Sequence, residues 1–181
     1  MLYDLRRADV RIKWLVTCLL ATVGLSYVFG ALMVALYAGF TPQRVAATYA
    51  GAEMSMPMPP DTTVVVQHPM STADFARPEV HTVDTDLLIQ DTHVHVPMYG
   101  VIAAALGVVV AGLSVRRGWA LGLITLLFAA PWLDFAGMWL TKFLSPRFAI
   151  ATLVGGWAMG AGYLVVTALA LYQMWWSHER S

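Results

Sequence analysis

The sequence contains little charge. Asp, Glu, Lys and Arg make up 12% of its 181 residues, about half of the roughly 25% that is usual in soluble domains. Hydrophobic residues make up 59%. This composition excludes an ordinary soluble domain and indicates a membrane protein. The net charge is zero and there is no basic tract, so a nucleic acid is not an expected partner.

Cysteine is almost absent. The single cysteine, Cys18, lies inside an apolar run and cannot form an internal disulfide. Cysteine-based zinc and iron–sulfur sites are therefore excluded, as is covalent haem attachment. The sequence also lacks a Gly-x-Ser-x-Gly motif and a phosphate-binding loop, so a non-catalytic subunit is more consistent with it than an enzyme.

Four long apolar runs are present, and each can form a helix that crosses a hydrocarbon core of ~30 Å. The sequence predicts an all-α, polytopic membrane protein with four transmembrane helices and a long external loop between the first two. The first run is too long for a signal peptide. The predicted boundaries are 1–13 for the N-terminal segment, 14–38, 96–115, 119–140 and 148–175 for the helices, 39–95 for the loop and 176–181 for the C-terminal tail.

The external loop contains signals for short helices. Thr41 and Pro42 predict a helix start, because threonine caps helices and proline suits their first turn. Asp84 or Thr85 can cap another helix. Whether that helix continues into the second span through Pro97 stays open, because an internal proline removes a helix hydrogen bond.

The positive charges near the helix ends differ between the two sides. Seven lie on the side of the termini and four on the side of the loop. The positive-inside rule then predicts cytoplasmic termini and an external loop, in the inner membrane of a bacterium. Small residues also recur at four-residue spacing, which predicts close helix packing, either within this bundle or against another subunit. These pairs are Ser26 with Gly30, Ala103 with Gly107, and Gly156 with Gly160.

The candidate ligands lie on the loop side. His93 and His95 mark the rim of the second span. In an extended segment they share a face and can chelate one metal, whereas in a helix they point about 200° apart. Asp134 lies within the third span, where an ionisable group normally faces the interior. We expect it near the two histidines, as a ligand or as the acceptor that orients an imidazole. The alternatives are quinone or proton handling by the histidines, or structural hydrogen bonds by all three side chains.

The loop adds softer ligands. Met54, Met56 and Met58 place three thioethers on one side of an extended strand, which suits Cu(I), whereas an imidazole such as that of His68 suits Cu(II) or haem iron. The alternative is a linker whose methionines cover the membrane surface or a neighbouring subunit. Because the first, third and fourth spans contain no histidine, ligation of a haem by two histidines within the membrane is excluded, while histidine–methionine ligation stays open.

Two stretches together resemble a group of uncharacterised bacterial four-helix membrane proteins. They are GFTPQRVAATYAG (39–51), after the first span, and THVH (92–95), at the start of the second. The resemblance implies an association with respiratory membrane complexes and carries over Thr92, His93 and His95 as a site. Pro97 departs from the pattern of the group, so the depth of His95 in the membrane and the direction in which its side chain points stay open.

The leading hypothesis is an accessory subunit of a bacterial membrane redox complex, respiratory or copper-containing, that binds copper or haem near the outer surface. Its expected partners are the lipid bilayer, a larger membrane protein complex and a periplasmic cytochrome or cupredoxin. One alternative is a purely structural subunit that packs against a larger enzyme. Another is a copper-handling or assembly protein that uses the methionine run.

Overall fold

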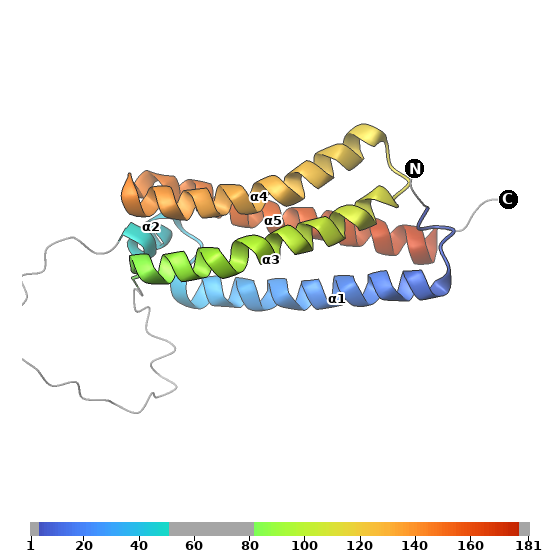
Figure 1. Cartoon of the computed structure of the whole chain (residues 1–181), viewed down its shortest axis with the longest axis horizontal. Helices are drawn as coiled ribbons and strands as arrows, with labels where there is room; N and C mark the ends of the chain where they lie inside the picture. Colours follow the sequence, from blue (N-terminus) through green and yellow to red (C-terminus); the bar gives the residue numbers. More distant parts are fainter. Residues whose placement is uncertain (1–3, 51–81, 178–181) are drawn as a thin grey trace, which may run out of the picture.

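A computed structural model describes residues 4–50 and 82–177 (Figure 1). Four of its helices are long and apolar enough to cross a membrane, counting the short turns that extend them, which confirms an all-α, multi-pass membrane protein. A fifth, short helix, α2, lies at one end of the bundle (Figure 1). The helices are α1 (Val10–Met33) with η1 (Val34–Ala38), α2 (Pro42–Ala50), α3 (Thr85–Ala111), α4 (Arg117–Phe143), η3 (Pro146–Phe148) and α5 (Ala149–Leu171) with η4 (Tyr172–Trp176).

The second spanning helix is continuous through Pro97, which answers the question that the sequence left open. α3 begins at Thr85, whereas the sequence placed the span from Val96. Asp84 caps it, because its carboxylate accepts a 2.7 Å hydrogen bond from the backbone N–H of Leu87. The short helix α2 begins at Pro42, as the sequence predicted.

The two ends of the bundle are built differently. We call the end where α1 begins and α5 finishes the terminal end, and the end that carries α2 the loop end (Figure 1). The terminal half holds the main hydrophobic core, to which all four long helices contribute. Representative buried members are Leu20, Leu106, Leu127 and Val166.

Hydrogen bonds lock the terminal end. The backbone N–H of Leu5, a fully buried residue, donates to the carbonyl of Gly112 over 2.9 Å. The buried Gln173 side chain accepts from the backbone N–H of Ser114 over 2.8 Å. These bonds fasten the N-terminal segment and the end of α5 to the α3–α4 connection.

α4 and α5 form the most extensive helix pair. Their backbones approach at two glycines: an added Cβ on Gly137 would clash with Thr152, and one on Gly155 would clash with the backbone of Asp134. The sequence predicted this role for Gly156 and Gly160 instead. The prediction that those two glycines pack closely within the bundle is wrong, since an added Cβ on either meets nothing within 4 Å. Their contact with another subunit stays a prediction.

Candidate functional site

The loop half of the bundle encloses a cavity of about 480 Å³. Its walls come from α1, α3, α4 and α5, and α2 contributes Tyr49 at the loop end. The most exposed lining residues are on α1 and α5, and include Val28, Trp157 and Leu164 at 64%, 67% and 65% exposure. Because these residues belong to membrane-spanning helices, the cavity opens sideways towards lipid.

The positions of the buried residues in α1 show why the cavity forms there. The buried residues of this helix are Val16, Leu20 and Val23, all in its first half. From Gly24 to Ala38 no side chain is buried. The hydroxyl of Tyr163 in α5 donates a 2.6 Å hydrogen bond to the carbonyl of Leu20, which holds α1 at the floor of the cavity.

Aromatic rings make up much of the wall. Tyr27 stacks on Tyr163 with ring centroids 4.9 Å apart. Nearer the loop end, Phe40 lies 6.0 Å from Trp157 in a tilted arrangement. These pairs offer flat apolar surfaces together with hydroxyl groups, a combination that suits a ring-bearing ligand.

Among the polar side chains that line the same cavity are Asp134, Tyr49 and Tyr99. Asp134 is only 8% exposed, so it faces the interior as its charge predicts. Within residues 4–50 and 82–177, its carboxylate makes no hydrogen bond or salt bridge, and neither tyrosine hydroxyl makes a hydrogen bond. Asp134, Tyr49 and Tyr99 therefore present a carboxyl group and two phenols to the cavity with unused hydrogen-bonding capacity.

The short helix α2 holds Tyr49 in place at the loop end. The buried Thr48 accepts, through its carbonyl, a 2.8 Å hydrogen bond from the N–H of Val83. Val83 in turn accepts, through its carbonyl, a 2.7 Å bond from the Lys142 ammonium of α4.

Burial raises the pKa of the Tyr49 phenol, and the carboxylates of Asp134 and Asp91 raise it further. Tyr49 thus stays a hydrogen-bond donor at physiological pH.

The two histidines of the Thr-His-x-His motif lie on a continuous helix and point in different directions. His93 is exposed. His95 is half-buried, and its Nδ1 lies 3.0 Å from the carboxylate of Asp91 and 2.8 Å from its carbonyl. The acceptor that orients an imidazole is therefore Asp91, one turn earlier in α3, and not Asp134.

The first residue of the same motif joins two helices. The hydroxyl of Thr92 donates to the carbonyl of Leu88 over 2.7 Å and accepts a 2.9 Å bond from the indole N–H of Trp139 in α4. His95 also lies beside Tyr99, with ring centroids 6.0 Å apart. The motif thus links α3 to α4 through Thr92, and its His95 contacts Tyr99, which lines the cavity.

The remaining predicted ligands, His68, Met54, Met56 and Met58, lie outside the described residues. Within the part of the chain that the structure describes, no group of three or more His, Cys, Asp or Glu side chains could hold a metal ion. Met138 and Met159 line the cavity and are candidates for the methionine of a histidine–methionine haem site, but His93 and His95 do not line it.

Asp91, Tyr49 and Tyr99 were not predicted from the sequence as site residues. Asp91 precedes His95 by one helical turn, a spacing that would have paired them had α3 been known to begin at Thr85. Tyr49 carried no such signal, because its position depends on how α2 folds over the bundle.

A model of a family of transmembrane helical domains (Aq_1264_TM) matches residues 39–181. The chain belongs to this family. The segment that matches Aq_1264_TM includes α2 to α5 with Tyr49, Tyr99 and Asp134, whereas α1 precedes it. No curated protein and no solved structure matches the chain.

Proposed function

We propose that this chain is a non-catalytic subunit of a bacterial inner-membrane redox complex and that it binds a lipid-soluble molecule in the loop-end cavity. The observation that carries the proposal is Asp134, an ionisable side chain that is 8% exposed and lines a cavity of about 480 Å³. A polar group at such a position is unfavourable in a membrane unless a partner satisfies it. A ligand with a polar head and an apolar body would supply that partner.

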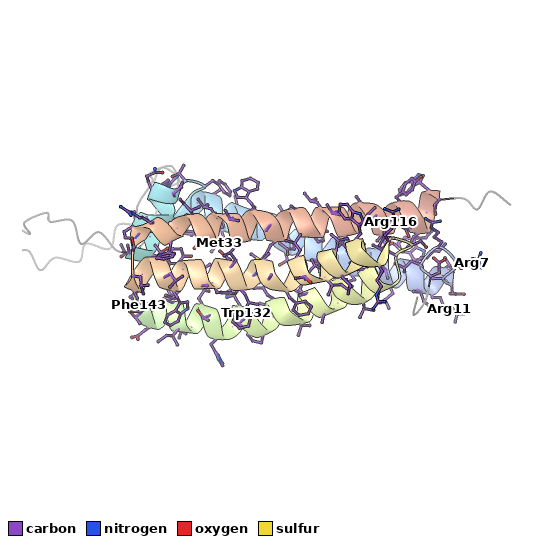
Figure 2. All side chains as sticks on the ribbon, turned by 90° about the horizontal axis from the view of Figure 1, so that it is seen from above. Arg7, Arg11, Met33, Arg116, Trp132 and Phe143 are labelled. Atoms are coloured by element: carbon purple, nitrogen blue, oxygen red, sulfur yellow. The ribbon has the colours of Figure 1, made fainter. Side chains whose placement is uncertain are left out.

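The distribution of charge supports an orientation with the termini in the cytoplasm. Arg7, Arg11 and Arg116 gather at the terminal end, far from Phe143 at the loop end (Figure 2). By the positive-inside rule, the cavity then lies in the outer half of the inner membrane. A ligand bound there would be accessible to partners on the periplasmic side.

The experiment uses two matched glycines. An added Cβ on Gly160 meets nothing within 4 Å, and this residue lines the cavity. Gly122 also has no atom within 4 Å of an added Cβ but does not line it. Neither Gly160→Leu nor Gly122→Leu should therefore disturb folding, and both gain the same helix propensity.

The wild-type protein and both variants would be purified in lipid nanodiscs, and the retained lipid-soluble molecules would be extracted and quantified by mass spectrometry. We expect one class of molecule to be enriched over bulk lipid in the wild type and in Gly122→Leu, and to fall at least fivefold in Gly160→Leu. Equal retention in all three proteins would overturn the proposal. If Gly160→Leu instead released the chain from a larger complex, the purely structural subunit would be supported.

A second candidate function is a copper or haem site at His95. The specific observation is that Asp91 engages Nδ1, which leaves Nε2 available as a ligand in the orientation that such a carboxylate imposes. About one copper or haem per chain, lost in His95→Ala and reduced in Asp91→Asn, would support it. Elemental analysis and an optical spectrum measure this.

For the copper-handling alternative, replacing Met54, Met56 and Met58 by serine should lower copper affinity more than His95→Ala does.

A further inference from the structure

The charges around the cavity limit what its ligand can be. Asp134 is the one acidic residue among the described lining residues, and no Lys, Arg or His accompanies it. An anionic head group would lie beside the carboxyl group of Asp134 in a medium of low dielectric constant, with no cation among these lining residues to offset its charge. The cavity is therefore unsuited to a phosphate, a carboxylate or an anionic lipid head.

The depth of Asp134 sets a second limit. α4 has 27 residues and is about 40 Å long, so it extends roughly 5 Å beyond each face of a 30 Å hydrocarbon core. Asp134 lies about 13 Å before the end of this helix at Phe143, and hence roughly 8 Å inside the hydrocarbon. Phospholipid head groups stay outside that region. The polar part of the ligand must be one that enters hydrocarbon readily.

The functional groups of the cavity suit a ring that carries oxygen atoms. The phenols of Tyr49 and Tyr99 can donate hydrogen bonds to carbonyl oxygens, and the carboxyl group of Asp134 can accept one from a hydroxyl. The aromatic pair Phe40 and Trp157 offers surfaces against which a flat ring can pack.

A tail would fit along the outer half of α1. This stretch, from Gly24 to Ala38, is about 21 Å long and has no buried side chain. Opposite it, Gly156 and Gly160 of α5 leave open space where larger side chains would stand. Small residues on both sides thus form a narrow apolar channel that continues from the polar head region.

We infer, building on the ligand-binding role proposed above, that the cavity binds a lipid-soluble quinone in its quinone or quinol form. The ring lies beside Asp134, Tyr49 and Tyr99, and the tail runs between the outer half of α1 and the small residues of α5.

The test measures binding of a decyl-substituted benzoquinone to the protein in nanodiscs. Trp157 lines the cavity and its fluorescence is expected to be quenched by a nearby quinone ring. We expect saturable quenching in the wild type, most of which is lost in Trp157→Phe. The exposed Trp119 is far from the cavity, and Trp119→Phe is the matched control.

Variants locate the head and the tail. Tyr49→Phe and Tyr99→Phe each remove one hydroxyl group and should weaken quinone binding about fivefold, and Asp134→Asn should weaken it about tenfold. Gly160→Leu should abolish it by filling the tail channel. Tyr172→Phe, at the terminal end and 60% exposed, should leave binding unchanged.

Two competitors with similar tails separate this inference from the proposed function. If dodecyltrimethylammonium or dodecyl phosphate saturates a site that Gly160→Leu removes, while the benzoquinone does not bind, the quinone inference is overturned and the ligand-binding role stands. If none of the three probes binds saturably and Gly160→Leu changes nothing, both fail. Benzoquinone binding that is insensitive to Asp134→Asn, Tyr49→Phe and Tyr99→Phe alike would also overturn the assigned position of the ring.

Discussion

The terminal half and the loop half of the bundle use the same kinds of helix for different purposes. In the terminal half, apolar side chains from all four long helices meet, and Leu5 and Gln173 close the end with hydrogen bonds. In the loop half, the helices stand around a cavity, and the side chains of Asp134, Tyr49 and Tyr99 face it without a hydrogen bond to any of the described residues. The difference indicates that stability is concentrated in the terminal half, and the ligand binding proposed for the loop half fits this division, because binding sites often sacrifice some packing.

The largest expected effect tests the tight contact between α5 and α4 at Gly155, in the loop half. Gly155→Leu would force a side chain against the backbone of Asp134, and should destabilise the protein by about 3 kcal/mol through overpacking. Gly156→Leu, one residue later, points into open space and should change stability little. Unfolding in mixed detergent micelles, followed by circular dichroism, measures both. Similar losses in the two variants would contradict the α4–α5 geometry.

The hydrogen bonds of the terminal end should matter next. Gln173→Leu would leave the partly buried N–H of Ser114 without its acceptor, and should lower the free energy of unfolding by about 2 kcal/mol. Gln90→Leu, on an exposed position near the loop end, is the control and should have little effect. The same unfolding measurement compares them. Equal small effects would mean that the terminal end is less tightly closed than its bonds indicate.

A smaller effect is expected at the border between the halves. Tyr163→Phe removes the hydrogen bond to the carbonyl of Leu20 and should cost about 1 kcal/mol, because that carbonyl lies in a helix and keeps other capacity. Tyr172→Phe should have no effect, since Tyr172 is exposed. A loss well above this value would show that α1 depends on this contact more than on its own buried face.

The smallest effect is expected at the loop end of the cavity, where Lys142 of α4 is bonded to Val83. Lys142→Met removes a 2.7 Å bond to the carbonyl of Val83 at a partly exposed site, and should change global stability by no more than about 0.5 kcal/mol. Its local consequence is faster amide exchange at Val83, whose N–H binds Thr48. Hydrogen exchange measured by mass spectrometry detects this. Unchanged exchange at Val83 would show that Lys142 does not hold the loop end.

The long apolar runs were sufficient to predict the four spanning helices, because length and hydropathy alone decide whether a helix can cross a membrane. They did not predict that α3 extends back to Thr85, since the segment before Val96 is polar and Pro97 interrupts the pattern. Continuity there depends on contacts such as the bond between Thr92 and Trp139, which no local pattern reveals.

The rotation of each helix about its axis was harder to predict than its existence. Gly155 and Gly156 are adjacent, yet one meets the backbone of α4 and the other faces the cavity. A four-residue spacing identifies a small-residue face without saying what covers it. The buried position of Asp134 was predictable because charge in a membrane helix favours the interior, but its neighbours, Tyr49 and Tyr99, depend on tertiary structure.

The sideways opening between α1 and α5 changes which concentration governs binding. A ligand that enters from the bilayer competes with lipid molecules and not with water, so its mole fraction in the membrane sets occupancy. For a ligand present at about one molecule per 100 lipids, half-occupancy requires a preference over lipid of about 2.7 kcal/mol. Two or three hydrogen bonds of about 1 kcal/mol each provide that preference. Asp134, Tyr49 and Tyr99 are therefore enough for the proposed selective binding, and the apolar walls need only match what lipid already offers.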